Sequence, residues 1–491
     1  MANQAYDKLV QLCSELQILK DTQSLLSWDQ EVNMAKKGVA YRAAQLSFLS
    51  GETHTRFTDP KVGDWIAEAR GDDSLDQHQR ANLREWDREY KRDTCLPVEL
   101  VKKMAKTRVT AHEAWAEARE KSDFSLFRKP LAELIELSKE QVSYWGYEET
   151  PYNGLLDIYE KGATIDKIDR VFADYKNDLI PLVEQACALD RMEPEALQGE
   201  YPIDKQAAFN REVAASIGFD FDAGRIDTAV HPFCTGLGPF DTRLTTRYDT
   251  GDFRSSLYGV LHEAGHGLYD QGVNPDYHGT PCGEAVSLGV HESQSRLWEN
   301  HVGRSLAFWE KWLPVAVTYF PNLDQLNAVE MTRAANLANK SFIRVEADEV
   351  TYDLHVILRY EIEKAIFSGE LALDEIPDAW NSKFKESFGM EVDSYANGCL
   401  QDIHWSMGGF GYFPTYTLGN LNASHLVAAA REHDGVAGDM DQGEFGSLLS
   451  WMREKIHSAG SLYPPEELIE RAAGKPVSPE AHLDHLRSRY L

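Results

Sequence analysis

The segment Leu261-His262-Glu263-Ala264-Gly265-His266 contains the pattern HExxH. Apolar residues surround it at the three- and four-residue steps of a helix that is buried on most sides, namely Phe253, Leu257, Val260, Leu261, Ala264 and Leu268. Asp252 is a suitable N-cap for this helix, and Gly272 is a suitable residue to end it. The spacing therefore predicts one internal helix that carries the HExxH pattern.

The two histidines of this segment stand about one helical turn apart. Their imidazoles therefore project from one face and can bind one metal ion. Glu263 is rotated by roughly 100° from His262, so it lies near the metal without having to bind it, as a general base requires. The alternative interpretation is a pair of stacked surface histidines. The apolar helix argues against it, because burying His and Glu without partners costs several kcal/mol.

A catalytic zinc ion takes three protein ligands and keeps one position for water, so a third ligand is needed. Glu292 is the candidate, in a predicted second helix after a Gly- and Pro-rich loop at 272–283. Spacing alone leaves two alternatives open: His291 is the ligand, or Glu292 is a surface carboxylate paired with Arg296 at i+4. Two imidazoles and one carboxylate predict metal-assisted hydrolysis of an amide, in which Glu263 moves the proton of the water.

The composition predicts a large helical protein. The chain has 491 residues, of which 43% are hydrophobic and 26% charged, so a substantial core is expected. Helical spacing dominates the first two hundred residues, and the best alternating run, at 243–248, predicts only a small β hairpin near the site. We therefore predict an all-α fold in which 1–491 form a single peptidase domain, with a helical N-terminal part at 1–200 and a catalytic part at 201–491.

The charge balance excludes several classes of partner. Lys and Arg number 50 and Asp and Glu 79, which gives a net charge of −29. Such a chain disfavours duplex nucleic acid and anionic membranes, which recruit basic patches. The start of the chain lacks the pattern of a secretory leader, no run of 18 apolar residues occurs, and the six cysteines form no CxxC pair. We expect reduced thiols, a cytoplasmic location, and no nucleic-acid or membrane partner.

Six short motifs occur in the order typical of the carboxypeptidase Taq group of metallocarboxypeptidases, and the chain resembles that family. The motifs are His231-Pro232-Phe233, Asp241-Thr242-Arg243-Leu244-Thr245, His262 to His266, His291-Glu292-Ser293-Gln294, Ile343-Arg344-Val345-Glu346-Ala347-Asp348, and Gly398-Cys399-Leu400-Gln401-Asp402-Ile403-His404-Trp405. Similarity near both ends, at 28–30 and 451–460, extends the resemblance over essentially the whole chain. One departure is Met34-Ala35, where the family pattern has a proline after the methionine.

The resemblance implies a largely helical fold with a deep central groove, similar to neurolysin and angiotensin-converting enzyme, with residues 1–200 covering the groove. It implies a homodimer and one divalent metal per chain, with zinc expected and cobalt or manganese as alternatives. It implies removal of single C-terminal residues, with broad specificity, from peptides with a free C-terminus. The family's metal ligands correspond to His262, His266 and Glu292, and its general base corresponds to Glu263.

A carboxypeptidase must bind the free α-carboxylate of its substrate, and Arg can do so through two hydrogen bonds. Arg344 is the first choice, supported by its family motif. The alternative is a helix-surface ion pair with Asp348 at i+4. Tyr416, in a Gly-rich loop that begins at Gly411, is expected to add a hydroxyl donor. Its alternative is an aromatic ring that packs on the core.

Other motif residues are candidates for binding substrate. His231, His404 and Tyr412 are candidate oxyanion donors, and the two histidines could instead orient metal ligands. Arg243 and Gln401 are expected to line the groove or to be structural. Asp270, four residues after His266, either accepts a proton from an imidazole or is a solvated helix-end residue.

Two rival functions remain on sequence grounds. An HExxH endopeptidase, oligopeptidase or aminopeptidase would share the metal, Glu263 and the chemistry. A helical peptide-binding scaffold with an inactive metal site is the rival from another class. Glu263 argues against the scaffold, because loss of the base is the simplest route to an inactive relative.

Overall fold

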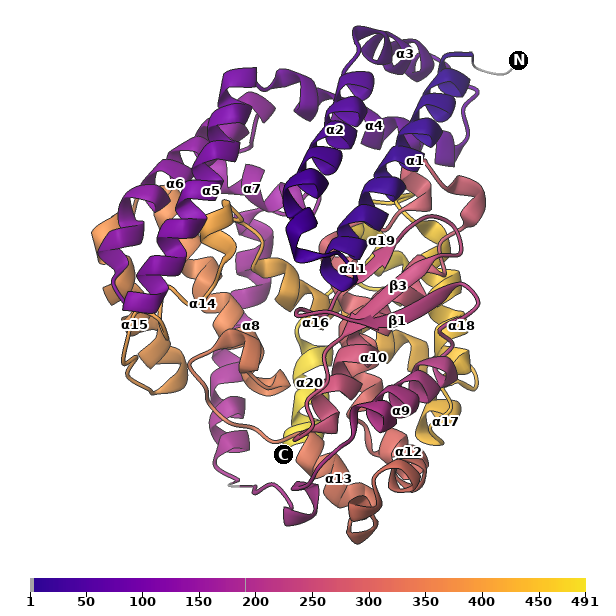
Figure 1. Cartoon of the computed structure of the whole chain (residues 1–491), viewed down its shortest axis with the longest axis vertical. Coiled ribbons are helices and arrows are strands. Elements are labelled where there is room, and N and C mark those ends of the chain that lie inside the picture. The colour runs from indigo at the N-terminus through magenta and orange to yellow at the C-terminus, as the bar shows by residue number, and fades with distance from the viewer. Residues whose placement is uncertain (1–3, 190) are drawn as a thin grey trace. The chain divides into compact units, whose positions relative to one another are not determined.

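The computed structural model describes residues 4–189 and 191–491, and Figure 1 shows its elements. Helices contain 70% of the chain and strands 3%, which confirms the predicted all-α class with a small β element. The chain forms two compact units, each built from three segments of sequence. The first contains the described residues of Met1–Thr94, Met192–Ala335 and Asn422–Val477, and the second those of Cys95–Arg191, Asn336–Leu421 and Ser478–Leu491.

The first unit holds the predicted HExxH helix. Its elements are α1 (Gln4–Val32), α2 (Val39–Phe57), α3 (Pro60–Arg70), α4 (Gln77–Cys95), α9 (Ile203–Ser216), β1 (Gly224–Thr228), β2 (Cys234–Gly236), β3 (Thr242–Thr246), α10 (Phe253–Asp270), α11 (Leu288–Arg296), a π-helix (Leu297–Gly303), α12 (Leu306–Tyr319), α13 (Ala328–Ala335), α17 (Val436–Asp441), α18 (Gly446–Lys455) and α19 (Pro465–Ala473).

The second unit is helical throughout its described elements. These are α5 (Val98–Lys121), α6 (Phe124–Trp145), α7 (Pro151–Tyr159), α8 (Ile165–Cys187), a 3₁₀ turn (Arg344–Glu346), α14 (Glu349–Ser368), α15 (Ile376–Phe388), a second 3₁₀ turn (His404–Met407) and α20 (Glu480–Tyr490). The boundary at 421/422 falls within α16 (Pro414–Arg431). The assignment of 1–491 to one peptidase domain, divided at 200, stays a prediction.

Helix α10 forms where its sequence predicts it. Asp252 caps its start by accepting a hydrogen bond from the backbone N–H of Arg254 at 3.0 Å. The six apolar residues at helical spacing are all buried. The helix ends at Asp270 with Gln271 as its C-cap, so the expectation that Gly272 ends it is one residue late. Burial of this stripe fixes which residues of α10 remain to face the site.

The predicted hairpin is part of a larger element. Strand β3 lies between β1 and β2, antiparallel to β2 and parallel to β1. Figure 1 labels β1 and β3, which lie side by side. The parallel strand was not predicted, because Gly-Arg-Ile-Asp-Thr carries a single apolar side chain and shows no alternation. Four of the five residues of β3 are buried, and α10 packs against this strand. The small sheet therefore supports one side of the HExxH helix.

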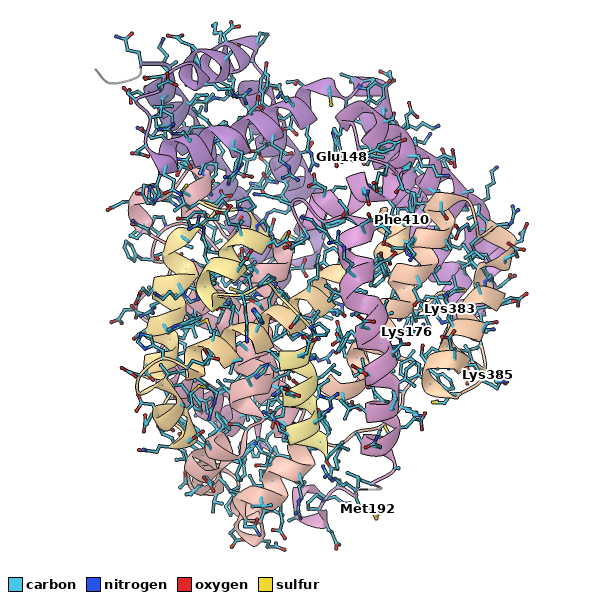
Figure 2. The ribbon with its side chains drawn as sticks, turned by 180° about the vertical axis from the view of Figure 1, so that it is seen from behind. Glu148, Lys176, Met192, Lys383, Lys385 and Phe410 are labelled. Atoms are coloured by element: carbon cyan, nitrogen blue, oxygen red, sulfur yellow. The ribbon has the colours of Figure 1, made fainter. Side chains whose placement is uncertain are left out.

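Helix α14 is the core helix of the second unit, and most of its residues are buried. Lys176 of α8 and Lys383 of α15, both labelled in Figure 2, donate hydrogen bonds to the carboxylate of Glu361 on α14, at 2.9 and 2.6 Å. Burial opposes the charge of Glu361, but these two lysines outweigh it and lower the pKa of its carboxyl. Ionic contacts thus join three helices of this unit.

The described residues contain neither a membrane-spanning helix nor a disulfide. Among them, no helix combines the length and the apolar character needed to cross a lipid bilayer. All six cysteines are described, and none of them lies in a disulfide.

Candidate metal centre

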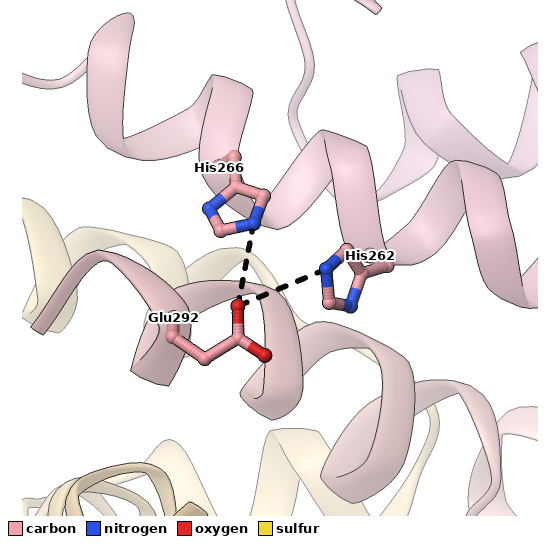
Figure 3. Close-up of side chains that lie close together, drawn as sticks. All are labelled: His262, His266 and Glu292. Carbon is pink, nitrogen blue, oxygen red and sulfur yellow. Dashed lines mark ion pairs between the residues drawn. The ribbon is translucent and has the colours of Figure 1, made fainter. Parts of the chain in front are cut away.

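The two histidines of α10 project from the same side of the helix, as their spacing predicts. Their ring centroids lie 5.0 Å apart, with the ring planes nearly perpendicular (Figure 3). Both side chains are mostly buried, with exposed fractions of 21% for His262 and 15% for His266. Two imidazoles held this way on one helix could supply two of the protein ligands of a four-coordinate metal site.

Gly265 lets a second helix approach α10 closely. A Cβ atom at this position would lie 2.5 Å from the backbone oxygen of Gln294 and 2.6 Å from the Cα of Ser295. The backbone of α11 therefore passes directly over the glycine inside HExxH. Ser287 starts α11 by accepting a hydrogen bond from the N–H of Val290 at 3.2 Å. This close contact brings Glu292 of α11 beside both histidines.

Glu292 points from α11 toward the two rings (Figure 3). Its Oε2 lies 3.6 Å from Nε2 of His266 and 3.9 Å from Nε2 of His262. One ligand atom from each of the three residues lies within 4.8 Å of the others. Two imidazole nitrogens and one carboxylate oxygen at this spacing form a donor set that suits a divalent metal and leaves a position for water. The residues present therefore fit the metal that the sequence implies.

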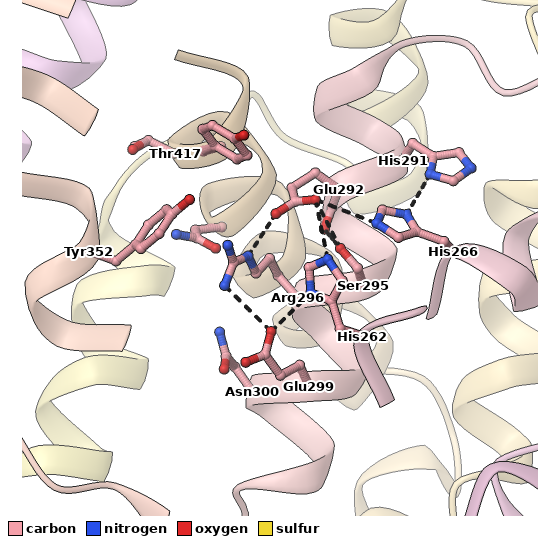
Figure 4. Close-up of polar contacts among 12 residues, drawn as sticks. His262, His266, His291, Glu292, Ser295, Arg296, Glu299, Asn300, Tyr352 and Thr417 are labelled. Carbon is pink, nitrogen blue, oxygen red and sulfur yellow. Dashed lines mark hydrogen bonds and ion pairs between the residues drawn. The ribbon is translucent and has the colours of Figure 1, made fainter. Parts of the chain in front are cut away.

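The role of Glu292 as a metal ligand stays a prediction, and its side chain is only 13% exposed rather than on the surface. Its Oε1 accepts a hydrogen bond from Nε of Arg296 at 2.8 Å, which is the predicted i+4 pair, while Oε2 faces the histidines. The other alternative placed a ligand at His291. Its Nδ1 instead lies 2.5 Å from Nδ1 of His266, on the side of that ring away from Glu292 (Figure 4).

Glu263 is almost completely buried, with 6% of its surface exposed. Burial raises the pKa of its carboxyl to about 7, with the charge of His262 opposing the shift and that of Glu292 adding to it. A carboxyl group with a pKa near neutrality can both accept and return a proton.

Sequence reasoning missed Glu299. It lies in the π-helical turn after α11, and its Oε2 is 3.0 Å from Nδ1 of His262 (Figure 4). Burial opposes a charge on His262, but the carboxylates of Glu292 and Glu299 outweigh it and raise its pKa to about 9. The site therefore favours positive charge where a cation would bind. The i+3 spacing from Arg296 to Glu299 was the one signal in the sequence. We call His262, His266, Glu292, Glu263 and Glu299 the metal-facing cluster.

Two predicted substrate residues lie in the same unit as the metal-facing cluster. His231 lies in an exposed bend between β1 and β2. Arg243 of β3 pairs with Asp241 through two hydrogen bonds, at 3.0 and 2.9 Å, and its guanidinium lies 4.2 Å from the ring centroid of Trp28 on α1. The contact with Trp28 joins the small sheet to α1. The predicted roles of His231 and Arg243 toward substrate stay predictions.

The other five predicted substrate residues gather in the second unit. The backbone N–H of Arg344 donates to Oε1 of Gln401 at 2.9 Å, and its guanidinium lies 4.9 Å from the ring of Tyr416. Nε2 of His404 lies 3.3 Å from the hydroxyl of Tyr416. The ring of Tyr412 is 5.1 Å from that of His404 and 5.3 Å from that of Tyr416. Distant motifs of the sequence thus meet in one place.

Arg344 does not pair with Asp348, so that alternative is wrong. Arg344 lies in a short 3₁₀ turn before α14, and Asp348 caps α14 by accepting from the N–H of Thr351 at 3.0 Å. The carboxylate partner of Arg344 is Asp402, whose Oδ1 lies 3.0 Å from Nε and 2.9 Å from Nη2. Its Nη1 also donates to the hydroxyl of Tyr352 at 2.8 Å.

Asp402 lies between two buried arginines. Arg359 is fully buried and donates from Nε to Oδ2 of Asp402 at 2.6 Å, and Arg344 is 5% exposed. Burial opposes the charge of Asp402, but the two guanidiniums outweigh it and hold the pKa of its carboxyl well below its usual range. Burial, together with these guanidiniums, lowers the pKa of His404 to about 4, although Asp402 opposes the shift. We call Arg344, Arg359 and Asp402 the arginine cluster, which has two cations for one anion.

Tyr416 lies in a helix rather than in the predicted loop. Helix α16 begins at Pro414, and Tyr416 is in its first turn. Proline has a φ angle that suits the first position of a helix. The Gly-rich loop therefore ends at Pro414, before Tyr416, although its composition predicts a loop that includes Tyr416.

The sequence and the structure of this chain are similar to those of one family of metallopeptidases. The model of the carboxypeptidase Taq (M32) metallopeptidases matches residues 8–490. Thermostable carboxypeptidase 1 of Thermus thermophilus is 38% identical over 99% of this chain and 98% of its own. Carboxypeptidase 1 of Bacillus subtilis is 37% identical over 95% of this chain and 94% of its own. The crystal structure of an M32 carboxypeptidase from Deinococcus radiodurans superposes with a TM-score of 0.96 and 36% identity, covering 99% of this chain and 98% of the other.

Proposed function

We propose a division of roles among the residues of this chain, which belongs to the carboxypeptidase Taq (M32) family of metallopeptidases and is a metal-dependent carboxypeptidase. One divalent metal, proposed to be zinc with cobalt or manganese as substitutes, is held by His262, His266 and Glu292. The observation that carries this proposal is the convergence of three ligand atoms within 4.8 Å of one another. Nitrogen ligands with one carboxylate suit these three ions.

When bound, such a metal lowers the pKa of a coordinated water toward ~7 and polarises the carbonyl of the scissile bond. Glu263 is proposed to take the proton of the attacking water and to return it to the nitrogen of the leaving amino acid. Its burial supports this role, because a pKa of about 7 suits a group that both receives and returns a proton near neutral pH.

Arg344 is proposed to bind the α-carboxylate of the substrate. The surplus positive charge of the arginine cluster supports this role, because a buried cation that lacks its counter-charge favours an anionic ligand. Tyr416 is proposed to add a hydroxyl donor. His404 and Tyr412, with His231, are the candidate oxyanion donors, and Gln401 holds the backbone of Arg344 at 2.9 Å.

Three finer features are also proposed. The resemblance to the family supports a homodimer and broad specificity for the C-terminal residue, and size-exclusion chromatography with light scattering tests the first. The absence of disulfides among the six described cysteines supports a cytoplasmic location.

The test of the function uses a matched pair of peptides with free and amidated C-termini, and protein purified without added metal. We expect stepwise release of single residues from the free acid only, one equivalent of metal per chain, and loss of that metal in His262→Ala. Equal cleavage of the amidated peptide would favour the endopeptidase alternative. Full activity after removal of metal by a chelator would overturn the metal-dependent mechanism.

A further inference from the structure

Each imidazole that faces the metal position has a second nitrogen, and both second nitrogens have partners. For His262 this nitrogen is Nδ1, and its partner is Oε2 of Glu299 at 3.0 Å (Figure 4). A carboxylate only accepts hydrogen bonds, so Nδ1 of His262 must carry the hydrogen. The lone pair of the neutral ring is then on Nε2, which is the atom that faces Glu292.

His266 reaches a carboxylate through another imidazole. Its Nδ1 lies 2.5 Å from Nδ1 of His291, and Nε2 of His291 lies 3.1 Å from Oδ1 of Asp270. The two ring planes are inclined by 22° and the centroids are 4.5 Å apart. The distance between the two ring centroids is much longer than the distance between the two Nδ1 atoms, so the rings contact each other through their edges and not through their faces. A hydrogen bond that lies in the plane of the rings requires this edge-to-edge arrangement.

The direction of this chain of hydrogen bonds follows from its end. Asp270 only accepts, so Nε2 of His291 carries a hydrogen and its Nδ1 keeps a lone pair. That lone pair accepts from Nδ1 of His266, which leaves the lone pair of His266 on Nε2, 3.6 Å from Oε2 of Glu292. Two carboxylates on different helical segments therefore impose the same tautomer on both histidines.

The carboxylates themselves are fixed. Oε1 of Glu299 accepts from Arg304 at 3.1 Å, and Oε2 also lies 3.4 Å from Arg296. Arg304 is five residues after Glu299, the spacing that a π-helix brings onto one face. Arg296 also holds Glu292 at 2.8 Å, so one guanidinium contacts both a proposed metal ligand and the partner of another.

We infer that Glu299, and His291 together with Asp270, are positioning residues that fix the tautomer and the orientation of His262 and His266, so that both Nε2 lone pairs face one metal ion. This inference rests on the proposed metal site. Partners of this kind raise metal affinity by removing the free energy needed to select one tautomer and one ring orientation.

The test measures the dissociation constants of Zn²⁺ and Co²⁺ by chelator competition on the full-length protein. Glu299→Leu and His291→Phe remove the acceptors and should weaken binding by about 10- to 100-fold. Glu299→Gln and His291→Asn keep an acceptor oxygen near the same place, so their losses should fall below that range. Asp270→Leu frees the tautomer of His291 and should give a loss no larger than that of His291→Phe.

The matched control is Glu349→Gln. Glu349 is a buried carboxylate that lies 2.8 Å from Nε2 of His485, in the unit that contains none of the three proposed ligands. This variant should leave the metal affinity unchanged. Thermal denaturation of each metal-free variant separates loss of affinity from loss of folding. In ¹⁵N-histidine NMR spectra of the zinc-loaded protein, both ligands should show protonated Nδ1 and metal-bound Nε2.

Two outcomes would overturn the inference. One is equal affinity of Glu299→Leu, His291→Phe and the wild type, and the other is binding of the metal through Nδ1 of either histidine. If His262→Ala abolishes binding while these two variants bind normally, the inference fails and the proposed metal site stands. If His262→Ala binds metal like the wild type, the proposed site itself fails.

Discussion

The metal-facing cluster and the arginine cluster have opposite charge imbalances. The first has three carboxylates, and the arginines that contact them are Arg296 and Arg304. The second has two guanidiniums around one carboxylate. The carboxylates around His262 outweigh its burial and raise its pKa to about 9, whereas burial, reinforced by the two guanidiniums, lowers the pKa of His404 to about 4. The ligands proposed for the two clusters, a metal cation for the first and a carboxylate for the second, carry the sign that balances each surplus.

The two clusters also differ in how the sequence builds them. The proposed ligands lie on two helices within 262–292, and their geometry follows from helical spacing and one glycine. Arg344 and its partner Asp402 are 58 residues apart, in short turns and loops. Helical spacing therefore encodes the histidine pair of the first cluster, whereas only the folded chain brings Arg344 to Asp402.

The largest expected effect separates chemistry from metal binding within the first cluster. Glu263→Gln keeps the shape of the side chain and removes the base, so kcat should fall by about 10²- to 10⁴-fold. Metal content, measured by elemental analysis, should stay at the wild-type level. Glu310→Gln, a change on the exposed side of α12, is the control. Wild-type turnover by Glu263→Gln would remove this residue from the mechanism.

The second prediction tests the surplus charge of the arginine cluster. Arg344→Met removes the proposed carboxylate ligand, and the loss of charged hydrogen bonds should lower kcat/KM for a free-acid peptide by about 10- to 100-fold. Arg344→Lys should recover only part of this, because an ammonium group cannot form two parallel hydrogen bonds. Metal affinity should not change in either variant. An unchanged kcat/KM of Arg344→Met for the free-acid peptide would contradict carboxylate binding by Arg344.

The third prediction tests the contact that builds the metal-facing cluster. Gly265→Ala places a methyl group against the backbone of α11, so it should destabilise the fold by about 1–3 kcal/mol and weaken metal binding. Gly259→Ala is the matched control on the same helix, because its Cβ would meet only Oγ1 of Thr246 at 3.7 Å. Chemical denaturation and chelator competition measure both effects. Equal behaviour of the two variants would show that the close approach at Gly265 is unimportant.

The smallest expected effect is a pH dependence of stability from the arginine cluster. The pKa of Asp402 is lower in the folded chain than its unfolded value of about 3.9, so its stabilising contribution is complete above that value. The contribution is lost as the pH falls toward the folded pKa. Urea denaturation between pH 7 and pH 3 should therefore show that Asp402→Asn approaches the wild type in stability as the pH falls. A constant difference would contradict the assigned shift.

The sequence predicts the part of the molecule that a single helix controls. Asp252, the buried stripe and the histidine pair of α10 follow directly from local spacing. Oε2 of Glu292 lies 3.6 and 3.9 Å from the Nε2 atoms of the two histidines, and its role as a ligand stays a prediction. The contact of Glu299 with His262 depends on the π-helical turn, which no composition rule indicates. The pairing of Arg344 with Asp402 depends on tertiary packing, and so does the parallel strand β1. The local periodicity of the sequence cannot predict the Arg344–Asp402 pair or the pairing of β1 with β3.

The double contact of Arg296 has a consequence for how this sequence can change over generations. One guanidinium contacts Glu292 with Nε and Glu299 with Nη1, so two separate nitrogens of its rigid planar fork are used. A substitution at 296 would therefore disturb a proposed ligand and the partner of another in one step. We expect positions 292, 296 and 299 to be inherited together, so that drift at one of them is tolerated only where the other two have changed with it.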